Sequence, residues 1–109
     1  HAGITSRFEI NVGVDYQSDV NLVIETIRDI ATQHEEIFET PPPFVRLTDF
    51  GDSALKFQLF FWTNKVFRVE KIKSDLRIKI LEQFRKKNIV LPFPQRTVHI
   101  NNLPGEKPV

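Results

Sequence analysis

The sequence predicts an α+β fold of the ferredoxin-like type, in which a four-stranded antiparallel sheet carries two helices on one face. Two patterns support this. Apolar residues alternate with period two over four short segments and recur with helical spacing over two longer ones. The segments follow one another in the order βαββαβ, which is the split βαβ plan. At 109 residues, with 40% hydrophobic and 27% charged residues, the chain has the length and composition of one globular domain.

The first strand and the first helix follow directly from the two periodicities. Residues 7–14, "RFEINVGV", alternate strictly, so one side of the strand is apolar. Helical spacing then runs to residues 37–38, with Ser18 or Asp19 available as the N-cap. The three prolines at 41–43 are expected to stop this helix.

The middle of the chain predicts a hairpin and a second helix. Residues 45–47 and 55–61 alternate on either side of "DFGDS", a turn-forming sequence, which gives two antiparallel strands. The second helix begins near residues 64–66 and repeats its apolar positions as far as Phe84. Asn88 follows as a candidate for the left-handed conformation that ends many helices.

The C-terminal part opens with the stretch "LPFPQ". Pro92 and Pro94 remove two backbone donors and hold Leu91 and Phe93 extended, so this stretch predicts a stiff spacer that terminates the second helix. Val98 and Ile100 then look like a fourth strand. The predicted domain covers residues 7–101, between a linker or non-native remnant at 1–6 and a flexible tail at 102–109. Since the chain contains no methionine, we expect it to be a piece of a longer polypeptide or a processed chain.

The scan for chemistry predicts no enzyme, no cofactor and no metal site. The three histidines, His1, His34 and His99, stand alone, and cysteine is absent. Carboxylates such as Asp49 and Asp52 fall where turns prefer them. No phosphate-binding glycine loop or nucleophile motif occurs. The longest apolar run, "LFFW", is far too short to span a membrane.

Two surfaces remain as candidates for binding. Phe60 and Trp62 fall on the polar side of their strand, where exposed aromatic residues mark a protein interface, a hydrophobic cover of the hairpin or, in RNA-recognition domains, a base-stacking platform. The glycine-containing RNA-binding signature is missing, so we expect no nucleic-acid partner. The predicted first helix is acidic and the second is basic, which indicates either two solvated faces or a head-to-tail contact between copies.

Three blocks of the sequence together resemble a known family. "RFEINVGVDYQSD" at 7–19, "VRLTDFGDSALKFQLFFW" at 45–62 and "PFPQRTVHI" at 92–100 are similar to the C-terminal cytoplasmic α/β domain of small-conductance mechanosensitive channels, the MscS family. Asn88 stands where relatives commonly have glycine. No part of the chain corresponds to the membrane-spanning helices of such channels.

The resemblance implies a non-enzymatic role in a homo-heptameric inner-membrane channel that opens under tension and releases solutes on hypo-osmotic shock. This domain would form the cytoplasmic vestibule, attached to the membrane by N-terminal spans and passed by ions and small solutes. The segment after the prolines would enter a small β-barrel at the base. The alternative is a stand-alone regulatory module that binds a ligand or RNA. The residues implied at a subunit interface or portal are Phe60, Trp62, Lys71, Lys73, Lys79, Pro92, Phe93, Pro94, Val98 and Ile100.

Overall fold

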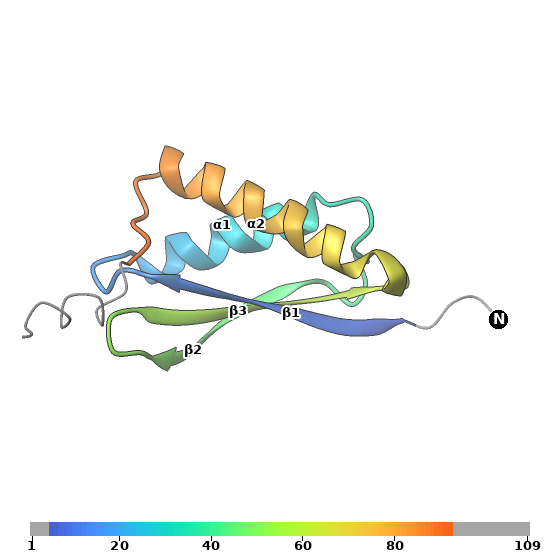
Figure 1. The fold of residues 1–109 in the computed structure, drawn as a ribbon, viewed down its shortest axis with the longest axis horizontal. Helices are drawn as coiled ribbons and strands as arrows, with labels where there is room; N and C mark the ends of the chain where they lie inside the picture. Colours follow the sequence, from blue (N-terminus) through green and yellow to red (C-terminus); the bar gives the residue numbers. More distant parts are fainter. Residues whose placement is uncertain (1–4, 93–109) are drawn as a thin grey trace, which may run out of the picture.

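The computed structural model describes residues 5–92, which form two layers. Both helices lie on one face of an antiparallel sheet, and no described element covers the opposite face (Figure 1). The elements are β1 (Ser6–Val14), α1 (Val20–Thr32), β2 (Phe44–Phe50), β3 (Leu55–Thr63), the short 3-10 helix η1 (Val66–Arg68) and α2 (Val69–Lys86).

The sheet of the described residues has three strands in the order β1-β3-β2. The α+β class with two helices on one face is therefore confirmed, whereas a four-stranded ferredoxin-like sheet is not seen. The predicted fourth strand, with Val98 and Ile100, lies outside the described residues. Strand β3 is central and pairs antiparallel with both of its neighbours.

The predicted alternation of β1 and β3 is confirmed by burial. Phe57, Leu59 and Phe61 of β3 are completely buried under the helices, while Phe60 and Trp62 lie on the open face and are half-buried. The antiparallel register places each inward residue of β1 beside one of β3, as with Phe8 opposite Phe61. This arrangement builds one apolar core between the sheet and helices.

The predicted extent of the first helix is wrong at its C-terminal end. Asp19 caps the helix by accepting a hydrogen bond from the amide of Leu22, but α1 ends at Thr32 and not at residues 37–38. Ile37 is still buried in the core, although it reaches the core from a turn. Buried apolar residues therefore recur with helical spacing beyond the end of the helix, and this spacing made the predicted helix too long.

The end of α2 shows that the prolines do not terminate this helix. Asn88 adopts φ 59°, and the amide of Ile89 donates to the carbonyl of Phe84 at 2.9 Å while the amide of Asn88 donates to the carbonyl of Arg85 at 3.4 Å. These two bonds form a Schellman motif, with Ile89 buried beneath it. The helix thus ends before Pro92, and the predicted left-handed conformation of Asn88 is confirmed.

This left-handed position gives a first testable prediction. Replacing Asn88 with alanine should lower the free energy of unfolding by about 1 kcal/mol, because a Cβ without a local polar group tolerates positive φ poorly, and Asn88→Gly should raise it slightly. Urea unfolding of the two variants measures this difference. Asn64→Ala, at an exposed position without positive φ, is the matched control, and an equal loss in both alanine variants would contradict the assignment.

Candidate functional site

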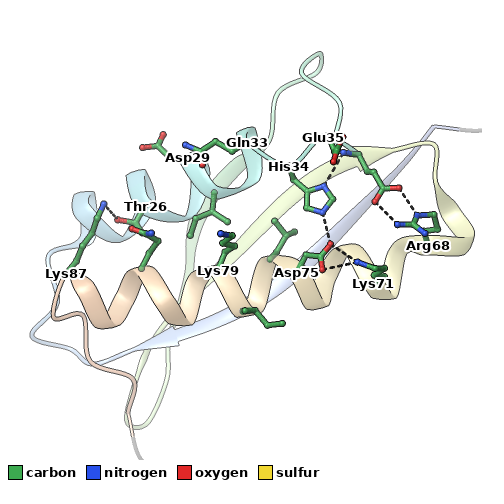
Figure 2. Close-up of a pocket in the computed structure, with 15 residues that line it drawn as sticks. Thr26, Asp29, Gln33, His34, Glu35, Arg68, Lys71, Asp75, Lys79 and Lys87 are labelled. Atoms are coloured by element: carbon green, nitrogen blue, oxygen red, sulfur yellow. Dashed lines mark hydrogen bonds and ion pairs between the residues drawn. The ribbon is translucent and has the colours of Figure 1, made fainter.

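An open groove of ≈ 830 Å³ runs along the helical face, between α1 with its following turn and α2 (Figure 2). The α2 side of the groove is a row of side chains spaced by four residues, which places them one above the other along the helix. This row consists of Lys71, Asp75, Lys79, Gln83 and Lys87. The opposite side is supplied by α1 and the turn after it, so the groove is where the acidic and basic segments of the chain meet.

His34 connects the two sides near one end of the groove. Its Nδ1 accepts a hydrogen bond from the amide of Glu36 at 3.1 Å, so the neutral ring carries its proton on Nε2 and donates it to Asp75 at 3.0 Å (Figure 2). The side chain of His34 is only 13% exposed. The isolated histidine of the sequence is therefore a structural clamp between the turn after α1 and helix α2.

A second contact fixes the same turn. Arg68 binds both carboxylate oxygens of Glu36, at 2.6 Å and 3.1 Å, in the forked geometry that suits a guanidinium (Figure 2). The carbonyl of Glu36 accepts a hydrogen bond from the hydroxyl of Thr63 at 2.7 Å, and the amide of Phe38 donates to the carbonyl of Trp62 at 2.9 Å. The turn is thus held by η1 and by the end of β3, in addition to the contact of His34 with α2.

These contacts lower the pKa of two carboxyl groups. The hydrogen bond from His34 lowers the pKa of Asp75 below its usual 3.8, and Lys71 adds to this effect. The hydrogen bond from Arg68 lowers the pKa of Glu36 below its usual 4.5 and in turn raises the pKa of Arg68. The carboxyl groups of Asp75 and Glu36 are therefore ionised at neutral pH.

The lowered pKa of Asp75 predicts a loss of stability in acid. Since the folded-state pKa lies below the unfolded value, the interaction stabilises the fold fully above about pH 5 and is lost as the pH falls through the folded-state pKa. We therefore expect the free energy of unfolding of Asp75→Asn to fall less steeply than that of the parent between about pH 5 and pH 2. Urea unfolding at several pH values measures the slopes.

Glu25→Gln provides the control for this comparison, because Glu25 is exposed on α1 and forms no ion pair among residues 5–92. Its slope should match that of the parent. Parallel slopes for the parent and Asp75→Asn would show that the contact between His34 and Asp75 contributes nothing to stability.

The open face of the sheet carries an aromatic cluster. Phe44 stacks on Phe60 with ring centroids 4.9 Å apart and lies 5.8 Å from Trp62. The guanidinium of Arg7 lies 5.0 Å from the centre of the Phe60 ring, and that of Arg46 lies 4.8 Å from the Phe44 ring. We call these five residues the aromatic–arginine patch. Such a combination is enriched in protein interfaces.

The structure describes six of the ten residues that the sequence analysis named for a subunit interface or portal. Phe60 and Trp62 belong to the aromatic–arginine patch. The three lysines of α2 contact their own chain: Lys71 pairs with Asp75, Lys79 lies 3.9 Å from Glu82, and the ammonium of Lys73 lies 5.9 Å from the Phe8 ring. Pro92 is half-buried and follows α2 outside any regular element. The remaining named residues lie outside the described part of the chain: Phe93, Pro94, Val98 and Ile100.

Sequence reasoning missed three members of the patch and the contact between His34 and Asp75. The alternation of β1 predicts that Arg7 lies on the polar side of its strand. It does not predict that Arg7 lies beside Phe60, because this depends on the register between β1 and β3. Phe44 lies just before the predicted strand, which begins at Val45, whereas the structure begins β2 at Phe44. A contact between residues 41 positions apart, such as the one from His34 to Asp75, leaves no local pattern to detect.

Comparison with known proteins identifies the family. The family model described as "Mechanosensitive ion channel MscS, C-terminal" matches residues 8–91. The chain belongs to the MscS family. It is 33% identical over 101 residues to the small-conductance mechanosensitive channel of Helicobacter pylori, which covers 93% of this chain and 37% of that protein. The resemblance noted from the three sequence blocks is therefore confirmed, and the family is not an enzyme family.

Two solved structures share the fold. The crystal structure of Helicobacter pylori MscS in its closed state superposes with a TM-score of 0.76 at 33% identity, over 84% of this chain and 36% of that one. The cryo-EM structure of Arabidopsis thaliana MSL1 gives a TM-score of 0.64 at 10% identity, over 83% of this chain and 34% of that one, which is a likeness of fold alone. This MscS-family chain spans little more than a third of these relatives.

Within residues 5–92 neither a membrane span nor a metal-binding group is found. No helix of this part is both long and apolar enough to cross a membrane. No three histidine, aspartate or glutamate side chains of this part gather closely enough to hold a metal ion.

Proposed function

We propose that this chain is the cytoplasmic vestibule and assembly domain of a tension-gated channel that releases solutes on hypo-osmotic shock. The observation that carries the proposal is the family match over residues 8–91, together with 33% identity to a small-conductance mechanosensitive channel. MscS-family channels are oligomeric, and we propose a heptamer for this one. It would be held in the inner membrane by N-terminal spans outside this chain, with the described domain on the cytoplasmic side.

The structure supports a role as a rigid wall and not as a moving part. One apolar core joins the sheet to both helices, and the turn after α1 is fixed by hydrogen bonds to α2 and to the end of β3. A domain with these contacts is suited to holding subunits in a fixed arrangement around a water-filled space. Ions and small solutes are then the species that pass it, and no nucleic-acid partner is required.

The function is tested with the full-length channel in a bacterial strain lacking its own mechanosensitive channels. We expect cells that express the channel to survive a sudden drop in external osmolarity, and membrane patches from them to show currents under suction. Full-length protein that reaches the membrane but gives neither survival nor tension-dependent current would contradict the proposal. Saturable binding of a cytoplasmic metabolite, measured by calorimetry, would instead favour the regulatory alternative.

The basic row of α2 allows a second measurement on the same channel. If α2 lines a portal, reversing Lys71, Lys73 and Lys79 should shift the ion selectivity toward cations, because the charge along the path changes sign. All three lysines already contact their own chain, so each reversal also tests whether those contacts matter for folding. Unchanged selectivity in a correctly assembled channel would remove α2 from the portal.

We further propose that the sheet of the intact protein gains a fourth strand from residues beyond Pro92. The observed order β1-β3-β2 contains three of the four strands of a ferredoxin-like sheet, in which the fourth strand lies beside β1. Among the described residues β1 is an edge strand. The amide of Asp15, just after β1, donates to the carbonyl of Val90 at 2.9 Å, so the chain leaves α2 beside this edge. Faster hydrogen exchange of β1 amides after truncation at Gln95 would support this pairing, and unchanged exchange would argue that the segment serves only assembly.

A further inference from the structure

The aromatic–arginine patch holds two positive charges without a negative partner in the described structure. Arg7 and Arg46 are exposed, and neither forms an ion pair within residues 5–92. Each guanidinium lies over an aromatic ring, which orients it while leaving its hydrogen-bond donors available. The patch is therefore prepared to bind carboxylates beside an aromatic surface.

The opposite layer of the same molecule holds the matching charges. Glu25 and Asp29 are exposed on α1, and Glu35 is exposed in the turn that follows. None of the three forms an ion pair among the described residues, and Arg28 is the one basic residue of α1. Asp29 lines the groove, but its side chain extends from α1 away from α2 (Figure 2) and forms no ion pair with the basic row of the groove.

Within one copy these charges cannot meet, because the patch and α1 lie on opposite sides of the sheet (Figure 1). Between copies they can. We propose that the aromatic–arginine patch of one copy binds the acidic α1 face of a second copy. This rests on the proposed assembly function and deepens it by naming the two surfaces. The contact is heterologous, with different surfaces on the two copies, and such contacts close into rings when the rotation between copies permits.

The contact differs from the one that the sequence suggested, in which the basic helix of one copy faces the acidic helix of the next. Part of this basic segment is paired within its own chain, through Lys71 of α2 with Asp75 and Arg68 of η1 with Glu36. Arg77 and Arg85 on α2 likewise form no ion pair within residues 5–92, but Arg7 and Arg46 are the two arginines of this part whose guanidinium lies over an aromatic ring. Arginine can bind a carboxylate through two donors at once. The half-buried rings of Phe44, Phe60 and Trp62 would supply the apolar centre of the interface.

Charge exchange tests the proposal on the 109-residue chain. The patch variant carries Arg7→Glu and Arg46→Glu, the helix variant carries Glu25→Lys and Asp29→Lys, and the exchanged variant carries all four changes. Self-association is followed by NMR chemical shifts over a dilution series at low salt, up to about 1 mM, the effective concentration that tethering commonly provides. All substituted positions are exposed, so the fold should survive.

The parent should show concentration-dependent shifts on the open sheet face and on α1 together. Each two-site variant should weaken self-association by at least about tenfold, and the exchanged variant should recover it to within about threefold. Arg77→Glu with Arg85→Glu on α2 makes the same change in net charge as the patch variant and should leave association unchanged.

Two outcomes would overturn the inference. Shifts confined to the open face, with no effect of the helix variant, would indicate a symmetric contact between two sheets. No concentration-dependent shift up to about 1 mM would leave the two surfaces without affinity for each other. Neither outcome bears on osmotic survival of cells with the full-length channel, so failure of this inference and failure of the proposed function are separate results.

Discussion

Replacement of Phe61 by alanine should cost about 3–5 kcal/mol of the free energy of unfolding, the largest effect we expect from a single substitution in this chain. Phe61 is completely buried in the central strand β3, and its ring centroid lies 6.1 Å from that of Phe8 on β1. Truncation would leave a cavity between the sheet and both helices. Because a domain of this size has about 5–15 kcal/mol in total, the variant should be close to unfolding.

The measurement is urea unfolding followed by circular dichroism, with Phe61→Leu as a milder variant if the alanine variant does not fold. Phe61→Leu should lose clearly less, since most of the buried volume is kept. The matched control is Phe60→Ala, one position along the same strand, where the half-buried ring stacks on Phe44. That change should cost no more than about 1.5 kcal/mol. Equal losses at the two positions would contradict the assignment of inner and open faces.

Replacement of Thr63 by valine should have the second largest effect, about 1–3 kcal/mol, although the two side chains have the same shape. Thr63 is completely buried, its hydroxyl donates to the carbonyl of Glu36 at 2.7 Å, and it accepts from the amide of Lys65 at 3.0 Å. Valine would leave both backbone groups without this partner. The turn after α1 should loosen as well, because its carbonyl is held by this hydroxyl.

Two readouts separate these consequences. Urea unfolding gives the loss of stability, and hydrogen exchange of the Phe38 amide, which donates to the carbonyl of Trp62, reports loosening of the turn. Thr48→Val is the control, because its exposed hydroxyl donates to the carbonyl of Lys56 at 3.2 Å near the end of the sheet. It should change stability by no more than about 0.5 kcal/mol. A comparable loss in both valine variants would show that burial of Thr63 is not the cause.

In the channel proposed above, these predictions concern whether the proposed vestibule domain keeps its shape. Phe61 joins the sheet to the helices, and Thr63 fixes the turn that carries His34 and Glu36. Variants that weaken either contact should reduce the amount of assembled channel before they change its conduction. The aromatic–arginine patch, in contrast, lies on a surface where substitution leaves the core intact, so an effect there would report on contacts between copies.

The sequence alone determined the class of fold, the faces of the strands and the family. Period-two alternation placed Phe57, Leu59 and Phe61 inward and Phe60 outward, because successive side chains of a strand must point to opposite faces. The sequence narrowed the cap of the first helix to Ser18 or Asp19 and predicted the left-handed conformation at Asn88, because both features depend on residues a few positions away. The structure shows that Asp19 is the cap. Strand alternation, helix caps and left-handed positions are predictable because each depends on residues that are close in the sequence.

Only the tertiary structure decided where the first helix ends and which polar groups meet. Ile37 keeps the apolar spacing but reaches the core from a turn, because the carbonyl of Glu36 and the amide of Phe38 bond to β3 in place of helical partners. The side chain of Glu36 binds Arg68 of η1. His34 meets Asp75, and Arg7 lies over Phe60, only after strands and helices distant in sequence have packed together. These contacts depend on register and helix packing across the whole domain, which no local pattern specifies.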